Sequence, residues 1–257
     1  MISKRNYRTL GESDILVSPI GLGSVKFGRN TGVKYPEAFA IPDDDDLKAL
    51  LDLARELGIN YIDTAPAYAD SETKLGKLLA HSRDYWCIST KVGEYYQSGR
   101  SHYDFSAAAT QTSIEASLKN LRTDVLDLVF VHSDGDDERV ITQTDVLESL
   151  QNLKDKGLIK LIGYSGKSET ECLLAMNYVD IFMITLNEQD QSQVPLIQAC
   201  QQYNKGVVIK KALASGYSTD TNAALNFAVN FPGVTSVIVG TINPDHLKEN
   251  VTGLVAE

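Results

Sequence analysis

Four side chains that can move protons or hold charge follow short apolar runs in the first half of the chain. Asp63 and Tyr68 stand five residues apart, and Lys91 and His132 close two later apolar runs. A tyrosine titrates near ~10 and is a weak acid at neutral pH. A lysine beside it would stabilise the phenolate and lower that pKa, and a carboxylate would keep the lysine charged. The set therefore predicts that Tyr68 protonates a carbonyl oxygen, which a neutral His132 polarises.

Each of these residues also has an ordinary structural explanation. A histidine after a strand is often a hydrogen-bonded structural residue, a tyrosine is usually packing, and an aspartate–lysine pair is usually a structural ion pair. The catalytic interpretation depends on all four reaching one place. The elements that precede them must therefore bring Asp63, Tyr68, Lys91 and His132 together.

Short apolar runs alternate with periodic apolar stripes along the whole chain, which predicts strands alternating with helices. The expected strands are 20–24, 59–63, 86–90, 125–131, 159–163, 181–186, 207–210 and 236–239. The expected helices are 47–57, 72–80, 107–121, 146–156, 168–177, 196–200, 223–230 and 247–255. Strict alternation requires crossover connections and a parallel sheet. Eight such units in 257 residues predict one α/β domain, 1–257, a (β/α)8 TIM barrel. A short N-terminal β-hairpin at 7–10 and 15–17 is expected before it.

The carboxyl ends of barrel strands meet at one mouth, where catalytic residues gather. Two long unassigned stretches, 26–46 and 91–106, follow the first and third strands and are expected to border that mouth. The acidic run 43–46 is interpreted as a cap for the following helix rather than a cation site.

The charge balance, the apolar runs and the cysteine and histidine content limit the kinds of molecule that the protein is expected to bind. The chain carries 24 basic and 34 acidic residues, a net charge of −10, which argues against a nucleic-acid or anionic-membrane binder. No apolar run approaches the ~20 residues of a membrane helix, and no signal peptide is visible. Three scattered cysteines and the absence of paired-histidine motifs predict no metal site and a cytoplasmic location. A small carbonyl compound is the expected partner, and the sequence carries no signal for an oligomeric state.

From residue 7 to residue 255 the chain resembles the aldo-keto reductases. The matching stretches are GINYIDTAPAY at 58–68, STK at 89–91, DLVFVH at 127–132 and VGTINPDHLKEN at 239–250. Their order and spacing match the family's Asp-Tyr-Lys-His tetrad. The resemblance implies NAD(P)H-dependent reduction of an aldehyde or ketone to the alcohol, or the reverse. Tyr68 would be the general acid, Lys91 with Asp63 would tune it, and His132 would orient the carbonyl.

The resemblance also implies a nucleotide extended across the mouth without a Rossmann unit. Gly21-Leu22-Gly23 does not complete G-x-G-x-x-G, because Lys26 stands where the third glycine is needed. The implied cofactor contacts are Gly23, Ser24, Lys26, Asp63, Ser165, Gly166, Lys210, Lys211, Gly240, Thr241, Asn243, His246, Glu249 and Asn250.

Several of these positions depart from the family pattern. Gly166 stands where Asn is usual, Met183 where Gln is usual, and Lys210 where a stacking tyrosine is common. Many members place Lys and Arg at the positions of Gly240 and His246 for a 2′-phosphate. NADPH is therefore expected as cofactor, with NADH more acceptable than usual. A solvated lysine at Lys26 and a plain helix cap at 241–250 are the alternatives for those positions.

Two connections are shorter than in larger members. The chain passes quickly through 213–225 and ends soon after the last helix, so an open pocket and fast cofactor exchange are expected. Two other functions remain open. One is a nucleotide-binding regulatory protein with little turnover, and the other is a barrel enzyme that forms a Schiff base with Lys91 or Lys210.

Overall fold

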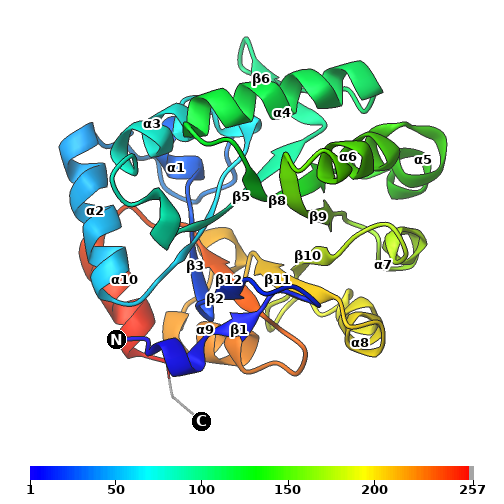
Figure 1. The fold of residues 1–257 in the computed structure, drawn as a ribbon. Helices are drawn as coiled ribbons and strands as arrows, with labels where there is room; N and C mark the ends of the chain where they lie inside the picture. Colours follow the sequence, from blue (N-terminus) through cyan, green and yellow to red (C-terminus); the bar gives the residue numbers. More distant parts are fainter. Residues whose placement is uncertain (255–257) are drawn as a thin grey trace.

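The computed structural model describes residues 1–254, and eight parallel strands form a closed barrel at its centre (Figure 1). The strands are β3 (Ile20–Gly23), β4 (Tyr61–Asp63), β5 (Cys87–Val92), β8 (Leu126–His132), β9 (Ile159–Ser165), β10 (Ile181–Thr185), β11 (Gly206–Lys210) and β12 (Ser236–Val239). They follow one another in sequence order around the barrel, and β12 pairs with β3 to close it. The predicted (β/α)8 fold is confirmed.

Helices form a ring outside the barrel (Figure 1). They are α2 (Asp44–Glu56), α3 (Ser71–Leu78), α4 (Ala107–Leu121), α6 (Val146–Asp155), α7 (Glu169–Cys172), α8 (Val194–Gln202), α9 (Thr221–Val229) and α10 (Pro244–Thr252). The α2 helix buries Leu47 and Leu50, and the Asp43 side chain accepts the Asp46 amide at 2.9 Å. The acidic run therefore caps this helix as predicted.

Three details differ from the expected elements. The helix expected at 168–177 is one α-helical turn, α7, continued by a 3-10 turn at Leu173–Ala175. The stretches left unassigned hold a short helix, α1 (Val25–Gly28), and an antiparallel hairpin of β6 (Glu94–Gln97) and β7 (Arg100–Tyr103). A further helix, α5 (Asp137–Gln143), follows β8. Val255, assigned to the last helix, lies outside the described residues.

The apolar core has two layers. One lies between the barrel and its helices, and the other fills the barrel itself. The predicted N-terminal hairpin, β1 (Arg8–Thr9) with β2 (Leu16–Val17), supplies Val17 to the inner layer, where it joins Tyr61, Phe130 and Met183. Met183 is therefore a core residue and offers no polar contact at the position where Gln is usual. Because packing fills the barrel, only its rim is free to carry chemistry.

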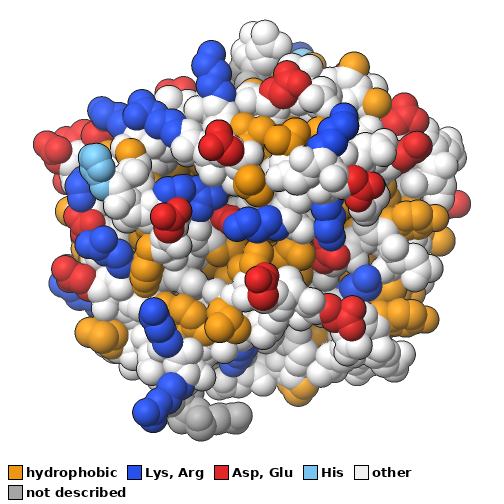
Figure 2. Space-filling view, viewed as in Figure 1, with side chains coloured by type: hydrophobic (Ala, Val, Ile, Leu, Met, Phe, Trp, Pro, Cys, Tyr) orange, Lys and Arg blue, Asp and Glu red, His pale blue; other side chains and the backbone are white. Residues whose placement is uncertain are grey.

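On the face shown in Figure 2, basic and acidic side chains are interspersed, and no continuous basic stripe is seen. Across residues 1–254, no helix combines the length and the apolar character needed to span a membrane.

Candidate active site

Strand register brings the predicted catalytic residues to one end of the barrel. Gly23 pairs with Asp63, Asp63 pairs with Ser89, and His132 pairs with Ser165. Lys91 lies two residues beyond Ser89 on the same strand. The last residues of β3, β4, β5, β8 and β9 therefore form one rim, as a parallel barrel requires.

Lys91 and Asp63 form a buried ion pair at this rim. The Lys91 ammonium donates to both Asp63 carboxylate oxygens, at 2.8 and 2.7 Å, and to the Thr64 carbonyl at 2.8 Å. Burial alone would lower the pKa of Lys91, but the adjacent Asp63 charge outweighs it and raises that pKa. Lys91 therefore stays cationic, and hydrogen bonds to Asp63 and Tyr68 favour that charged form.

Two further side chains fix the Asp63 carboxylate. Ser89 donates its hydroxyl to Asp63 Oδ1 at 2.7 Å, and Tyr61 donates its own to Ser89 at 3.0 Å. All three residues are buried. Ser89 was not predicted as a site residue, although its place in register with Asp63 follows from parallel pairing of the two strands.

Tyr68 lies directly above this pair. It ends a 3-10 turn at Pro66–Tyr68, and the Lys91 ammonium lies 4.8 Å from its ring centroid. Burial raises the pKa of Tyr68, and Lys91 lowers it only in part, so the net shift is upward. This is opposite to the expected lowering. The main cause is burial of the phenol, and the charges of Asp63 and Glu94 act in the same direction, so the phenol stays protonated although Lys91 acts in the expected direction.

The turn that carries Tyr68 is constrained on both sides. Ala69, the next residue, has φ +52°, in a region that favours glycine. On the other side, a Cβ added to Gly28 of α1 would lie 2.3 Å from the Tyr68 carbonyl oxygen and 2.4 Å from the Ser71 amide nitrogen. Backbone therefore packs on backbone here, which holds Tyr68 in one position.

His132, the fourth predicted residue, contacts a carboxylate that sequence patterns did not reveal. Its Nδ1 atom lies 2.8 Å from Oε2 of Glu94, the first residue of the hairpin. The geometry is not that of a hydrogen bond, and among the described residues Nδ1 has no hydrogen-bond partner. Burial lowers the pKa of His132, and Glu94 opposes that shift. Burial would raise the pKa of Glu94, but His132 brings it down to about 2.

The opposite side of the rim is built around Lys210. Its ammonium donates to the Ser165 hydroxyl at 3.0 Å and to the Gly166 carbonyl at 2.9 Å. Burial lowers the pKa of Lys210 to about 7, and repulsion from Lys211 acts in the same direction. A Cβ on Gly166 would lie 2.2 Å from Cys172 Sγ, so the Asn that is usual at this position has no room.

Two of the predicted cofactor contacts on β3 and α1 are already engaged. The Ser24 hydroxyl is buried and donates to the Asp63 carbonyl at 2.9 Å, so it is a structural group in this arrangement. The Lys26 ammonium lies over the rings of Tyr35 and Phe39, at 4.2 and 5.0 Å from their centroids. Burial lowers the pKa of Lys26, and Glu37 acts against that.

Tyr35 and Phe39 belong to residues 30–42, a segment without helix or strand that we call the strap. A Cβ on Gly240 would lie 3.0 Å from the Tyr35 hydroxyl, and one on Gly216 would lie 3.1 Å from Pro36. The strap therefore runs from the end of β3 to the connections after β11 and β12. It covers the side of the rim where the short 213–225 connection leaves no long loop.

The remaining predicted contacts lie where β12 leads into α10. Thr241 accepts the Asn243 amide at 3.1 Å, and the Asn243 side chain accepts the Asp245 amide at 2.8 Å, so both cap α10. His246 and Glu249 are exposed on that helix, whereas Asn250 is buried. These contacts agree with the simple capping role considered as the alternative.

Positive charge gathers on this side of the rim. Burial lowers the pKa of Lys211, repulsion from Lys34 and Lys167 lowers it further, and the Asp190 carboxylate acts against that shift. Lys211 in turn lowers the pKa of Lys210. A cluster of mutually repelling ammonium groups on a chain of net charge −10 fits an anionic ligand such as a dinucleotide, whose phosphates would relieve that repulsion.

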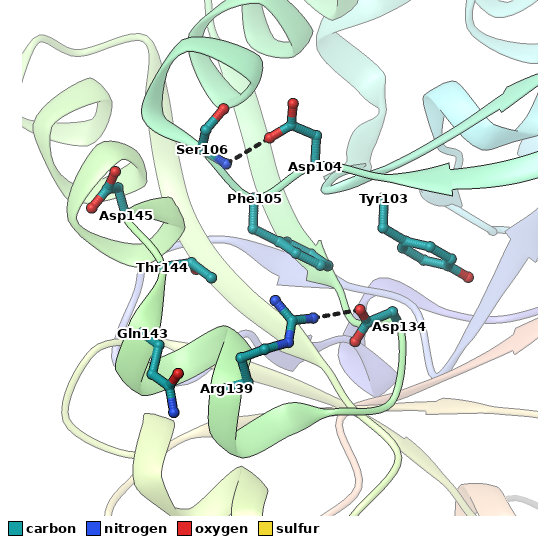
Figure 3. Close-up of a pocket in the computed structure, with 9 residues that line it drawn as sticks. All are labelled: Tyr103, Asp104, Phe105, Ser106, Asp134, Arg139, Gln143, Thr144 and Asp145. Carbon is teal, nitrogen blue, oxygen red and sulfur yellow. Dashed lines mark hydrogen bonds and ion pairs between the residues drawn. The ribbon is translucent and has the colours of Figure 1, made fainter.

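A hollow of about 340 Å³ is lined by residues 103–106, by Asp134 after β8 and by residues of α5 and the turn that follows it (Figure 3). Arg139 crosses it to pair with Asp134 at 2.5 Å, and Tyr103 and Phe105 stack at 6.2 Å between ring centroids. None of the four predicted catalytic side chains lines it. It borders the hairpin that carries Glu94, because Tyr103 pairs with Glu94 across that hairpin.

Comparisons with known proteins agree with this geometry. The chain is 25% identical to L-galactose dehydrogenase of Arabidopsis thaliana over 98% of its own length and 89% of that protein. It is 26% identical to D-threo-aldose 1-dehydrogenase of a Pseudomonas species, over 79% of the chain and 68% of that protein. A solved structure from Pseudomonas aeruginosa, described as an aldo-keto reductase, is 46% identical with a TM-score of 0.90, covering 97% of this chain and 94% of that one.

The family model described as the aldo/keto reductase family matches residues 19–223. That span begins just before β3 and runs into α9, so it includes every residue of the Lys91–Asp63 pair, the Tyr68 turn and His132. The chain belongs to the aldo/keto reductase family of oxidoreductases.

Proposed function

We propose that the protein interconverts a carbonyl compound and its alcohol with NAD(P)H, and that Asp63, Tyr68, Lys91 and His132 perform the chemistry at the substrate oxygen. The observation that carries this proposal is the Lys91 ammonium, fixed between the Asp63 carboxylate and the Tyr68 ring at the rim. A protonated phenol beside a fixed cation is suited to give its proton to an oxygen that gains charge.

The chain's own residues divide this task. Tyr68 holds a proton at its hydroxyl, because burial raises its pKa. Lys91 would stabilise the phenolate left after that proton moves, since a cation 4.8 Å from the ring centroid favours the charged form. Asp63 keeps Lys91 charged and oriented, and His132 reaches the same rim to position the substrate oxygen.

NAD(P)H would supply the hydride when bound. Lys210 and Ser165 are suited to its amide end, because an ammonium and a hydroxyl already meet there. Lys34, Lys167 and Lys211 would face its phosphates, and Gly240 leaves backbone accessible beside the strap. Lys26 would have to leave the Tyr35 and Phe39 rings to contribute.

An aldose is the substrate class that the relatives favour. Two of them are named for the oxidation of sugars, L-galactose in one case and D-threo-aldoses in the other. We infer that a small polyhydroxylated aldehyde or its cyclic lactol is a good first substrate. NADPH is the proposed cofactor, with NADH accepted, because no Lys or Arg stands at Gly240 or His246.

The direct test is a spectrophotometric assay of NADPH and NADH oxidation against small aldehydes, ketones and aldoses, with cofactor reduction by the matching alcohols and lactols. Turnover with at least one pair, running in both directions, is expected. Absence of turnover while the cofactor still binds would favour the regulatory, nucleotide-binding alternative instead.

A Schiff-base enzyme remains a second candidate for one reason. Burial and Lys211 bring the pKa of Lys210 to about 7, so a large share of its amine is uncharged at neutral pH. Lys91 is unsuited to this role, because Asp63 keeps it charged. Borohydride trapping with an aldehyde, followed by peptide mass analysis, distinguishes the candidates. A reduced adduct at Lys210 that is lost in Lys210→Met would support the second candidate.

A further inference from the structure

An arginine outside the predicted site residues contacts the loop that carries Tyr68. Arg29 directly follows α1, and its Nη1 atom donates to the carbonyl of Ala67, the residue before Tyr68, at 3.0 Å. The carbonyls at the end of a helical turn have no partner within that turn, and the turn Pro66–Tyr68 ends at Ala69, whose φ is +52°. Arg29 therefore supplies a charge-assisted hydrogen bond, the stronger kind, where the backbone leaves the turn.

The loop between β4 and α3 is thus held by two cations. The Lys91 ammonium donates to the Thr64 carbonyl at the start of the loop, at 2.8 Å, and Arg29 donates to the Ala67 carbonyl near its end. Lys91 belongs to the proposed catalytic set, whereas Arg29 does not. Because the backbone is held on both sides of the turn, the Tyr68 phenol has little freedom to move.

The strap in turn fixes the Arg29 guanidinium. Its Nε atom donates to the Thr31 carbonyl at 2.9 Å, and its Nη2 atom donates to the Gly32 carbonyl at 3.0 Å. Gly32 has φ +62°, and a Cβ added there would lie 3.0 Å from Arg29 Nη2, so the backbone curls around the guanidinium at a position that favours glycine. One planar group therefore joins the first residues of the strap to the Tyr68 turn.

The β6–β7 hairpin covers one face of the same group. The guanidinium carbon of Arg29 lies 3.6 Å from the centroid of the Tyr96 ring, a cation–π contact. The Tyr96 hydroxyl also lies 2.9 Å from the Thr31 hydroxyl, at hydrogen-bond distance. A lysine could not reproduce this arrangement, because its ammonium lacks the planar fork that binds several carbonyls and stacks on a ring.

We propose that Arg29 is a positioning residue for Tyr68: the strap and the hairpin fix its guanidinium, and the guanidinium fixes the turn that carries the phenol. This inference rests on the proposed function. It gives the strap a second task, because its first residues support the proton donor while its later residues cover the cofactor side of the rim. A displacement of about 1 Å in a catalytic group can cost about 100-fold in rate, so a turn released by Arg29 should turn over slowly.

Arg29→Met removes all three donors and keeps a side chain of similar length. Its kcat should fall about 10- to 100-fold, because the phenol is no longer held in place. The KM for the substrate should stay within about threefold of native, since a group that acts through Tyr68 makes no contact with the substrate. Arg29→Lys keeps the charge but not the fork, and it should recover part of the lost kcat.

Arg83→Met is the matched control. Arg83 also donates to a backbone carbonyl, that of Trp86 at 2.7 Å, and to the Asp127 carboxylate at 2.8 Å. It precedes β5 and so lies at the opposite end of that strand from Lys91. Arg83→Met should destabilise the fold, because it breaks a largely buried ion pair, yet kcat should stay within about twofold of native. A role of Arg29 limited to folding would make the two variants alike in kcat.

Hydrogen–deuterium exchange of the free protein tests the same contact without any turnover. The amides of residues 66–70 should exchange about tenfold faster in Arg29→Met, because the turn opens locally more often. The same amides should exchange at the native rate in Arg83→Met, whose side chain does not contact this turn.

Two results would overturn the proposal. One is a native kcat in Arg29→Met, and the other is a raised KM with unchanged kcat, which would make Arg29 a substrate contact. A protein inactive toward every substrate, whose exchange at 66–70 still depends on Arg29, would contradict the proposed function and support the role of Arg29 in holding the turn. The two failures are therefore distinguishable.

Discussion

The two sides of the barrel rim are built on different principles. On the side of β4, β5 and β8, the Lys91 ammonium is paired with the buried Asp63 carboxylate, and backbone packs against backbone at Gly28. On the side of β9, β11 and β12, ammonium groups repel one another, and a strap without regular structure covers the surface. The first side pairs its cation with a buried carboxylate, whereas the second brings several ammonium groups close enough to lower one another's pKa. We call the side of β4, β5 and β8 the fixed side and the side of β9, β11 and β12 the adaptable side.

The largest effect should follow from removing the cation on the fixed side. In Lys91→Met the Asp63 carboxylate stays buried without its partner, which should lower stability by about 3–5 kcal/mol. Turnover should fall about 100- to 10,000-fold, because the phenolate of Tyr68 loses its stabilising charge. Denaturant unfolding and steady-state kinetics measure the two effects.

Lys211→Met is the control for that variant, since Lys211 is exposed on the adaptable side. It should leave stability within about 0.5 kcal/mol of the native value, the range usual for surface changes. A Lys91→Met variant as stable as Lys211→Met would remove the distinction between the two sides.

A smaller loss should follow from one methyl group at Gly28. Alanine favours helices over glycine, but here its Cβ would lie 2.3 Å from the Tyr68 carbonyl oxygen and displace the turn. A displacement of about 1 Å in a catalytic group can cost about 100-fold in rate, so a 10- to 100-fold loss of kcat is expected for Gly28→Ala.

Gly240→Ala on the other side is the informative comparison. Its Cβ would meet only the end of the Tyr35 side chain, at 3.0 Å, and that side chain can rotate away. We expect kcat within about threefold of native. Equal losses in the two variants would show that the strap side is as rigid as the Tyr68 turn.

Sequence patterns revealed the fixed side better than the adaptable one, for physical reasons. Asp63, Lys91 and His132 end apolar strands, and parallel register alone brings strand ends together. Glu94 was missed because it begins a hairpin in a stretch with no apolar periodicity. Its meeting with His132 depends on how that hairpin folds over the rim.

The cofactor side could be predicted only by resemblance, and several of its residues proved to be engaged elsewhere. The Ser24 hydroxyl donates a hydrogen bond to the Asp63 carbonyl, and the Asn243 side chain accepts one from an amide of α10. The position of the strap could not be predicted from the sequence either, because its contacts with Gly216 and Gly240 join segments that are distant in sequence. Such contacts follow from tertiary packing rather than from local pattern.

The adaptable side should respond to pH through Lys210. Its pKa of about 7 lies below the usual lysine value, so it is charged below pH 7 and neutral above it. An anionic cofactor favours the charged form, so affinity should be greatest below pH 7 and weaken by up to about tenfold as pH rises. NADH is the suitable probe, because a 2′-phosphate titrates near ~6 and would add its own pH dependence.

Fluorescence titration between pH 6 and pH 9 measures this dependence. Lys210→Met should bind more weakly at low pH and show a flat profile. A native profile that is equally flat would mean that Lys210 does not face the cofactor.

The smallest effect concerns the choice between the two cofactors. Without a Lys or Arg at Gly240 or His246, the native preference for NADPH in kcat/KM should stay below a hundredfold. His246→Arg should increase that preference by about three- to tenfold, because His246 is exposed on the first turn of α10. A native preference above a hundredfold would place the 2′-phosphate against groups other than these.

The central claim is that substrate chemistry resides on the fixed side and cofactor binding on the other, and Tyr68→Phe tests it most directly. The account predicts that kcat falls at least about 100-fold while the Kd for NADPH stays within about twofold of native, since the change removes one hydroxyl at the substrate oxygen. Unchanged kcat in Tyr68→Phe would contradict the account.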